Sequence, residues 1–394
     1  MKINLAVFFG CISVEHEVSI ISAVQAMGNV NKEKYNCIPV YVTKSGEMLT
    51  GEHLLNIENY KDLPTLIKNA APVTFVKENG TVYMTYLKSG LFSNKKKTEI
   101  NLAFPIVHGT NCEDGTIQGY LEFLGLPYIG CDVLSSALGM DKAACKHVLK
   151  ANGINVLDCV TFTARQYAEN PQAVIEMLNK KIGLPLIIKP VNLGSSVGIS
   201  VVKQQEKLID SIELALSFSE TVLCERAITN LTEVNCSVLG DKDNCKASVL
   251  EQPLSNSDML SYEEKYLSSS KSKGMASLGR KIPADIPADT TLKIQQMATE
   301  AFRAVGASGV IRIDFMIDND SGEIYLNELN TIPGSLAFYL WDASGLKYPQ
   351  LIDELADLAF KRNRQRSNLM FTIKTNILSS AGGFGSKGAK GSKL

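Results

Sequence analysis

The stretch GVIRIDFMIDNDSGEIYLNELNTIPG, residues 309–334, predicts two short strands that flank a polar turn. Residues 310–317 are rich in β-branched side chains, which favour strands. Residues 318–322 carry the Asp, Asn, Ser and Gly side chains that are typical of turns, and residues 323–329 return to an extended pattern. The whole stretch is therefore expected to form a β-hairpin.

Four polar side chains of this hairpin are expected to lie close together. Side chains alternate along a strand, so Arg312 and Asp314 share one face of the first strand. In the same way, Glu328 and Asn330 share one face of the second strand. Two carboxylates and an amide oxygen would then converge beside a guanidinium. Such oxygen donors suit a hard cation such as Mg2+, and the guanidinium could hold a phosphate or a developing oxyanion.

A surface hairpin with its charges directed to solvent would give the same sequence pattern. The cation site is favoured because the charged positions interrupt an otherwise apolar run. Burying an unpartnered charge in such a run would be costly.

Length and composition are those of an ordinary globular protein. A chain of 394 residues allows two or three domains with cores of their own. The net charge of −1 argues against nucleic acid or a membrane surface as the main partner. The nine cysteines show no CxxC spacing and the four histidines no metal-ligand spacing, so free thiols are expected. No signal peptide or membrane-length apolar run is recognised, which predicts a cytoplasmic protein.

The pattern of elements predicts an α/β fold, with α+β character in part, arranged as three domains. The first domain, 1–135, opens as a strand–helix–strand unit without the GxGxxG dinucleotide fingerprint. Its expected elements are a strand at 3–9, a helix at 15–30, strands at 37–42 and 102–107, a helix at 115–124 and a short strand at 127–129. Residues 45–100 are more polar and less regular, with a solvated basic loop at 95–97.

A central domain at 136–225 and a third domain at 226–375 follow, and residues 376–394 are expected to be a flexible Gly-Ser-Lys tail. The central domain should contain a helix at 137–151, strands at 186–189 and 199–202, a helix at 210–217 and a strand at 222–226. The third should contain strands at 233–238 and 247–250, a long polar loop at 255–280, a helix at 290–305 and the hairpin. The polar loop suits a lid, although a disordered excursion would look the same.

Two further groups of residues could bind a nucleotide. The loop PVNLGSSVG at 190–198 could present backbone amides and the hydroxyls of Ser195 and Ser196 to phosphate oxygens, with Lys189 at its entrance. It is not a Walker A sequence, and a plain glycine hairpin would look alike. Glu225 and Glu233 could take a base amino group and a ribose hydroxyl, or could be exposed charges.

Taken in order along the chain, these features resemble the ATP-grasp fold and, more closely, the D-alanine–D-alanine ligase family. The matching motifs are SVEHEVS at 13–19, HGTNCEDGTIQG at 108–119, GMDK at 139–142, IIKPVNLGSSVG at 187–198, EEKYLS at 263–268, and RIDFM at 312–316 with NELNTIPG at 327–334. The resemblance implies a three-domain ATP-grasp architecture with an N-terminal Rossmann-like domain. It also implies ATP between the second and third domains, and a homodimer.

The resemblance assigns roles to individual residues. ATP would be bound by Lys142, Lys189, Ser195, Ser196, Glu225 and Glu233, and two Mg2+ ions, for which Mn2+ could substitute, by Asp314, Glu328 and Asn330. Glu15 would pair with the ammonium of the first D-alanine, with His108 nearby, and Arg312 with the Gly334 amide would form the oxyanion site. Tyr266 would link to Glu15 through Ser195, and Ser335 and Leu336 would contact the second amino acid.

The implied reaction is the ATP-dependent joining of two D-alanines through an acyl phosphate, for peptidoglycan precursors. A D-alanine–D-serine or other D-amino-acid ligase is an alternative, and a nucleotide-binding regulator without catalysis is a third. Tyr266 follows Lys265 as in dipeptide-forming relatives, where ester-forming relatives carry histidine.

Three departures from the family pattern affect these expectations. Cys11 and Cys112 stand where the family has glycine, so their backbones are expected to avoid left-handed angles. Ser335 and Leu336 follow Gly334 at once, without the residues that the family usually inserts there. The second amino-acid pocket is therefore expected to differ in shape.

Overall fold

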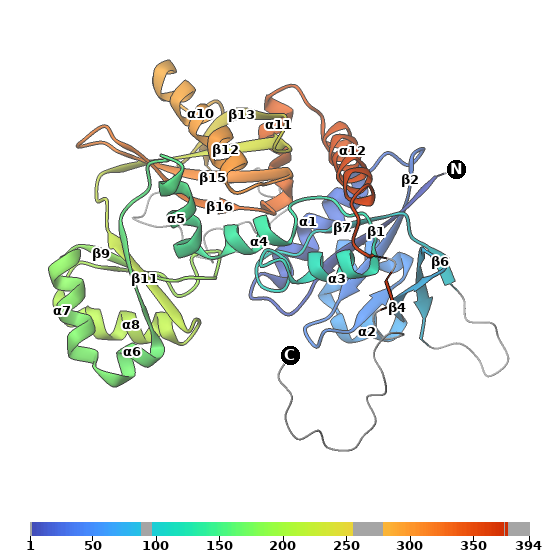
Figure 1. Ribbon diagram of the computed structural model, residues 1–394, viewed down its shortest axis with the longest axis horizontal. Helices are drawn as coiled ribbons and strands as arrows, with labels where there is room; N and C mark the ends of the chain where they lie inside the picture. Colours follow the sequence, from blue (N-terminus) through green and yellow to red (C-terminus); the bar gives the residue numbers. More distant parts are fainter. Residues whose placement is uncertain (1, 88–96, 255–278, 374, 377–394) are drawn as a thin grey trace.

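The computed structural model describes residues 2–87, 97–254, 279–373 and 375–376. Its described strands form three sheets, which lie in three separate parts of the molecule in Figure 1. Tyr266, most of the predicted lid loop and the 377–394 tail lie outside the described residues.

The first sheet has the strand order β6-β5-β4-β3-β2-β1-β7. Its strands are β1 (Ile3–Gly10), β2 (Tyr35–Val42), β3 (Met48–Thr50), β4 (Ala71–Glu78), β5 (Thr81–Tyr86), β6 (Lys97–Glu99) and β7 (Leu102–Pro105). The helical segments of this part are α1 (His16–Asn29), η1 (Glu52–Leu55), η2 (Ile57–Lys61), α2 (Leu63–Asn69) and α3 (Thr116–Leu124). Strand β1 pairs in parallel with both β2 and β7, which confirms the predicted strand–helix–strand start.

One prediction for this part was wrong in detail, and another lies partly outside the described residues. Of the predicted solvated loop at 95–97 the structure describes only Lys97, which is exposed but begins β6, pairs with Glu78 and places its ammonium over the ring of Tyr83. The strand predicted at 127–129 is reduced to a single bridge between Ala103 and Tyr128. The region 45–100 nevertheless extends the first sheet, as an elaboration of the domain should.

The helix predicted at 137–151 is two helices, α4 (Val133–Met140) and α5 (Lys142–Ala151). Asp141 separates them with an extended backbone, and its side chain accepts hydrogen bonds from the amides of Ala143 and Ala144. Such side-chain capping begins a new helix and ends the previous one. The break sets the direction of α5, which carries Lys142 and Lys146.

The second sheet is antiparallel, with the order β10-β9-β11-β8. Its strands are β8 (Cys159–Thr163), β9 (Leu186–Pro190), β10 (Ser200–Val202) and β11 (Thr221–Arg226), and its helices α6 (Ala164–Glu169), α7 (Pro171–Lys181), η3 (Gln205–Lys207) and α8 (Leu208–Leu216). The predicted strands and the helix near 210–217 are confirmed. Strand β8 and helices α6 and α7 were not foreseen.

The third sheet has the order β14-β13-β12-β15-β16. Its strands are β12 (Leu231–Gly240), β13 (Cys245–Pro253), β14 (Arg280–Lys281), β15 (Gly309–Asp318) and β16 (Ile324–Asn330), and α10 (Ala288–Ala304) packs on it. The chain ends its described part with η5 (Gly334–Ala337), α11 (Phe338–Ala343) and α12 (Tyr348–Ser367). The predicted hairpin is confirmed, because β15 and β16 pair antiparallel around the turn.

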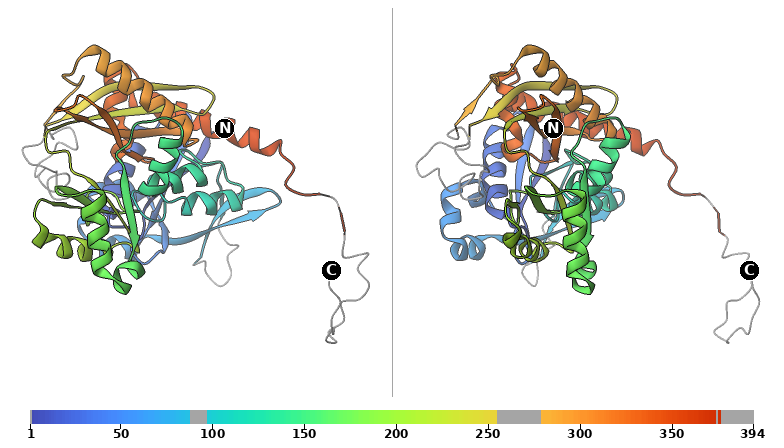
Figure 2. Two further views of the ribbon diagram at one scale, coloured as in Figure 1. Left: turned by 60° about the vertical axis from the view of Figure 1, so that its left-hand side comes forward. Right: turned by 90° about the vertical axis from the view of Figure 1, so that its left-hand side faces the viewer.

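Helix α12 crosses back to the first sheet, as Figure 1 and the two views of Figure 2 show. Its buried residues Leu351, Ile352 and Leu355 belong to the same hydrophobic core as β1 and β7. Within the described residues, no helix is both long and apolar enough to span a membrane.

Candidate active site

One large cleft collects residues from all three sheets. It has a volume of about 1140 Å3. Its wall includes Glu15 and His108 from the first part, Lys189 and Ser195 from the second, and the polar residues of the β15–β16 hairpin from the third. The predicted site residues Ser196, Glu233, Arg312, Asp314, Glu328, Asn330 and Gly334 also line it. The fold thus brings together most residues that the sequence had selected.

The hairpin holds its polar side chains in a fixed arrangement. Arg312 lies opposite Asn330, and Asp314 opposite Glu328, in the antiparallel register. The Arg312 guanidinium donates from Nε and Nη2 to the two oxygens of Asp314, at 2.6 and 2.7 Å. The Asn330 amide also donates to Asp314, at 3.1 Å. The predicted convergence is confirmed, with Asp314 at its centre.

The donor set of this hairpin fits a hard cation. The described residues hold no group of three or more His, Cys, Asp or Glu side chains that could bind a metal ion. A metal ion at the hairpin would therefore need the Asn330 amide oxygen as a ligand in addition to the two carboxylates. Asp314 and Glu328 supply carboxylate oxygens, and Asn330 supplies an amide oxygen once its side chain turns over. Lys142 Nζ lies 3.7 Å from Glu328 Oε2, which places a positive charge beside the carboxylates.

The lysines are organised around Glu225 beneath the cleft. Glu225 is fully buried, and its carboxylate pairs with Lys189 and, at 2.8 Å, with Lys146. Burial alone would raise the pKa of Glu225, but the two ammonium groups outweigh it and lower the pKa to about 2. Lys189 also donates to Asn327 at 3.1 Å. The Glu225 carboxylate therefore faces the lysines and is not part of the cleft wall, whereas Glu233 is.

The glycine loop after β9 reaches the first part of the chain. Ser195 donates from Oγ to Glu15, and both Ser195 and Ser196 adopt left-handed backbone angles, with φ of 53° and 60°. A Cβ on Gly194 would meet Glu15 Oε2 at 3.0 Å, so glycine allows this approach without moving the Glu15 carboxylate. The Glu15–Ser195 half of the predicted link is present. The Tyr266 half falls on residues that the structure does not describe.

His108 is buried and fully hydrogen-bonded. Its Nδ1 lies 2.8 Å from the Ile332 carbonyl, and its Nε2 lies 2.8 Å from Ser22 Oγ. A carbonyl can only accept, so Nδ1 carries the proton and Ser22 donates to Nε2. Burial lowers the pKa of His108 to about 4, helped by Arg312 and opposed by the Ile332 carbonyl. His108 is therefore neutral at physiological pH.

The segment after Gly334 turns sharply into a buried position. Ser335, Leu336 and Ala337 all have left-handed backbone angles, with φ of 49°, 57° and 49°. The Ser335 amide donates to Ser22 Oγ at 3.0 Å, so Ser22 joins this turn to His108. Gly334 lines the cleft, while Ser335 and Leu336 are buried. The segment after Gly334 is thus a tight turn held from α1, and the different shape expected for the second amino-acid pocket stays a prediction.

The expectation for Cys11 was wrong. Its backbone is left-handed, with φ of 77°, although it carries a Cβ. Its amide donates to the Val42 carbonyl at 2.6 Å, and its own carbonyl lies 2.6 Å from Nδ1 of the buried His16. These contacts with the neighbouring strand and helix hold the strained angle. Cys112 is buried and does not have a positive φ.

Comparison with known proteins agrees with this arrangement. Residues 4–131 match the family model described as D-ala D-ala ligase N-terminus, and residues 148–357 match D-ala D-ala ligase C-terminus. A D-alanine–D-alanine ligase from Thermosipho melanesiensis is 39% identical over 377 residues, covering 95% of this chain and 98% of that protein. This chain belongs to the D-alanine–D-alanine ligase family.

Solved structures of the D-alanine–D-alanine ligase family share the fold. The D-alanine–D-alanine ligase from Coxiella burnetii is 29% identical with a TM-score of 0.77, covering 93% of this chain and 96% of that chain. A D-Ala:D-Ser ligase from Enterococcus faecalis is 35% identical with a TM-score of 0.76, covering 91% of this chain and all of that chain. The protein is thus an ATP-dependent ligase with the mixed α/β architecture of these enzymes.

One carboxylate of this ligase was missed when single residues were selected from the sequence. Glu113 accepts from the amides of Gly109, at 2.7 Å, and Ile332, at 3.0 Å, and so ties the His108 loop to the Gly334 segment. Burial raises the pKa of Glu113 to about 8, with Glu15 adding to it, while the two amides oppose it. The motif at 108–119 contains this residue, but nothing in the spacing shows that it lines the cleft between these two segments.

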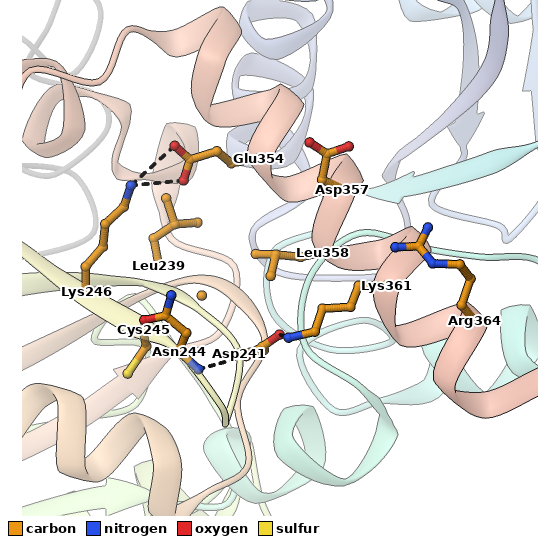
Figure 3. Close-up of a pocket in the computed structure, with 11 residues that line it drawn as sticks. Leu239, Asp241, Asn244, Cys245, Lys246, Glu354, Asp357, Leu358, Lys361 and Arg364 are labelled. Carbon is orange, nitrogen blue, oxygen red and sulfur yellow. Dashed lines mark hydrogen bonds and ion pairs between the residues drawn. The ribbon is translucent and has the colours of Figure 1, made fainter. Parts of the chain in front are cut away.

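A smaller cavity of about 420 Å3 lies between the β12–β13 turn and α12 (Figure 3). Lys246 pairs with Glu354 at 3.0 Å, and Lys361 with Asp241 at 2.6 Å. These pairs join α12 to the third sheet. None of the predicted site residues lines this cavity. Its ion pairs hold α12 against the third sheet and so have a structural role.

Proposed function

We propose that this ligase joins two D-alanines into D-alanyl-D-alanine through an acyl phosphate, to supply peptidoglycan precursors. The observation that carries the proposal is the single cleft in which the Glu15–Ser195 contact faces the Arg312, Asp314, Glu328 and Asn330 hairpin. One side offers a fixed carboxylate for an ammonium group. The other offers oxygen donors and a guanidinium for phosphate and oxyanion chemistry.

For ATP, the proposed contacts lie along the central and third sheets. Lys142 and Lys189 would contact the phosphates, and the 190–198 loop would cover them with the hydroxyls of Ser195 and Ser196. Glu233 lines the cleft and would take a ribose hydroxyl. Glu225 would act on the adenine side only after leaving its pairs with Lys189 and Lys146, so its proposed main role is to fix these two lysines.

For the metal, Asp314, Glu328 and Asn330 would hold Mg2+, in a site that in this family is expected to contain two ions and to accept Mn2+. Bound Mg2+ would neutralise charge on the phosphate groups during phosphoryl transfer. The oxygen-only donor set described above supports this assignment.

In the proposed reaction, Glu15 orients the first D-alanine through its ammonium group. The carboxylate of that D-alanine attacks the γ-phosphorus of ATP, ADP leaves, and an acyl phosphate forms. The amine of the second D-alanine, after losing a proton, attacks the acyl carbon. Arg312 and the Gly334 amide stabilise the tetrahedral oxyanion before phosphate leaves. Tyr266 is proposed to complete the Glu15–Ser195 link from the loop that excludes water.

The acceptor is proposed to be D-alanine, bound beside the turn that starts at Gly334. Gly334 lines the cleft, whereas Ser335 and Leu336, which were expected to contact the acceptor, are buried. D-Serine is the second candidate, because the 35% identical enzyme from Enterococcus faecalis is named a D-Ala:D-Ser ligase. The purified enzyme should be incubated with ATP, Mg2+ and equal amounts of D-alanine, D-serine and D-lactate, and its products identified by mass spectrometry. Predominant D-alanyl-D-alanine supports the proposal, and predominant D-alanyl-D-serine moves the chain to the second candidate.

Absence of phosphate release with every amino acid tested would instead favour a nucleotide-binding regulator.

The domain limits 1–135, 136–225 and 226–375, a cytoplasmic location and a homodimer complete the proposal. The exposed apolar side chains of Phe123 on α3 and Leu134 on α4 support a subunit contact. Light scattering after size exclusion would test the dimer.

A further inference from the structure

A row of polar side chains runs across four strands of the third sheet. Asn235 on β12 lies opposite both Glu251 on β13 and Asp314 on β15, and Asp314 lies opposite Glu328 on β16. Directly opposed residues of antiparallel strands point to the same face of the sheet. All four side chains line the large cleft. The row therefore continues well beyond the carboxylates proposed to bind metal.

At the far end of the row, Glu251 gathers three donors. Its Oε1 accepts from Asn235 Nδ2 at 3.0 Å and from the Tyr339 hydroxyl at 2.7 Å. Its Oε2 lies 3.1 Å from Nη1 of Arg280 on β14. The Arg280 guanidinium also stacks over the Tyr339 ring, 4.3 Å from its centroid. Glu251 thus fixes an arginine and a tyrosine at the cleft wall, which both of them line.

Tyr339 reaches this position because of the turn that follows Gly334. Helix α11 begins at Phe338, directly after the left-handed residues Ser335, Leu336 and Ala337. The helix is anchored to β12, since Trp341 Nε1 donates to Ser237 Oγ at 2.9 Å. Ser237 lies opposite Arg312 in the sheet. The segment that departs from the family pattern therefore places Tyr339 on the same cleft wall as Arg312, whose guanidinium is proposed to hold the oxyanion.

The hydrogen-bond donors at this end of the cleft are suited to an anion, while Glu251 and Asp314 balance the charges of Arg280 and Arg312. Burial and Glu251 raise the pKa of Tyr339 far above its ordinary value, although Arg312 and Arg280 act against the shift. The phenol therefore stays neutral and remains a hydrogen-bond donor. A guanidinium has five N–H donors in a planar fork, so Arg280 can keep Glu251 while it binds a second carboxylate.

We propose that Arg280 and Tyr339 form the subsite for the α-carboxylate of the acceptor amino acid, beside Arg312. The inference rests on the proposed ligase function and deepens it by assigning the group that the acceptor pocket recognises. Arg280 supplies the opposite charge, and the ring of Tyr339 limits the space for the acceptor side chain. Glu251 acts as a positioning residue, because it holds both side chains and contacts no substrate in this scheme.

Position along the row favours a carboxylate over an ATP phosphate at this subsite. The phosphate-binding lysines lie at the opposite end, where Lys142 approaches Glu328. Neighbouring strands are about 5 Å apart, so Glu251 on β13 lies about 10 Å from Asp314 on β15. This separation leaves room for an acceptor whose amine points to the reacting carbon and whose carboxylate points to Arg280.

The test is a competition between D-alanine and D-alaninamide for the acceptor site. D-Alaninamide has the same amine and side chain but no free carboxylate, so it can serve as acceptor and never as donor. The ratio of D-alanyl-D-alanine to D-alanyl-D-alaninamide is measured by mass spectrometry. Both products form from the same acyl phosphate, so changes in ATP binding, donor binding or acyl-phosphate formation leave the ratio unchanged. The ratio should favour D-alanine in the unaltered enzyme. Arg280→Gln should lower it by about tenfold or more, as expected when a charge-assisted contact is lost.

Arg280→Lys should lie between these values, because it keeps the charge and loses the fork. Tyr339→Phe should lower the ratio by less, and either variant carries the test if Arg280→Gln does not fold. Arg165→Gln is the matched control, since Arg165 is exposed on α6 and pairs with Glu169 on the same helix. An unchanged ratio in active Arg280 variants, or a raised KM for ATP with an unchanged ratio, overturns the subsite. Absence of both products from the unaltered enzyme would instead overturn the proposed function.

Discussion

Arg312 and Asp314 face each other two residues apart on β15, with both carboxylate oxygens of Asp314 held by the guanidinium. Asp314 therefore has to divide its oxygens between Arg312 and a bound metal ion. If a metal ion takes one oxygen of Asp314, Arg312 loses one of its two hydrogen bonds to that carboxylate. The freed N–H group could then donate to an oxyanion. The pair thus joins metal binding to the preparation of the acyl-transfer site.

Removing a carboxylate from the hairpin should abolish turnover. Glu328→Gln and Asp314→Asn keep side-chain size but remove the charge that a hard cation requires. We expect phosphate release with ATP and D-alanine to fall by at least about a hundredfold, with circular dichroism unchanged. Glu323→Gln is the control and should keep activity, because Glu323 is exposed and directly precedes β16. Near-normal activity of Glu328→Gln at saturating Mg2+ would contradict the assignment.

Glu225 should give the folded protein an acid-dependent stability. Its pKa is lowered to about 2, below the ordinary value of 4.5, so its contribution is complete above about pH 5 and is lost as pH falls toward 2. The contribution is on the order of 3 kcal/mol at neutral pH. Urea unfolding of the unaltered protein and Glu225→Gln should show a stability gap at pH 7 that shrinks by about 1 kcal/mol at pH 4. A gap independent of pH would show that the lysine pairs do not lower this pKa.

His108 should contribute in a higher pH range. Its pKa is lowered from 6.5 to about 4, so the unfolded chain binds more protons between these values and the folded state weakens as pH falls through them. Between pH 7 and 5.5 the loss should be about 1 kcal/mol, and His108→Asn should lack it. Thermal unfolding at both pH values measures the difference. His53→Asn is the control, because His53 is a partly exposed residue of η1, remote from the cleft wall.

Ser195→Ala should weaken the donor side of the reaction. The substitution removes the hydroxyl that donates to Glu15 and leaves that buried carboxylate with one partner fewer. We expect KM for D-alanine to rise by roughly tenfold and KM for ATP to change less. Initial rates of ADP formation with each substrate varied in turn measure both constants. A rise in KM for ATP with an unchanged KM for D-alanine would place Ser195 at the ATP phosphates only and contradict this expectation. Ser217→Ala, at the exposed end of α8, serves as control.

The hairpin could be predicted nearly to the residue, because alternation along a strand fixes which side chains share a face. The loop at 190–198 and the Glu15 contact followed from motif order. Other features depend on partners distant in sequence. Glu225 turns away from the cleft because Lys146 on α5 pairs with its carboxylate. The prediction of a single helix at 137–151 did not give the direction of α5, so this pair could not be foreseen. Likewise, Cys11 accepts a left-handed angle only through contacts with β2 and His16.

The return of α12 has a consequence for how the chain is made. The hydrophobic core of the first sheet includes Leu351, Leu355 and Ala359 of this helix. When the first seven strands have been translated, α12, which completes their hydrophobic core, has therefore not yet been synthesised. The nascent N-terminal part must wait, with an apolar surface uncovered, through the translation of about two hundred and fifty further residues.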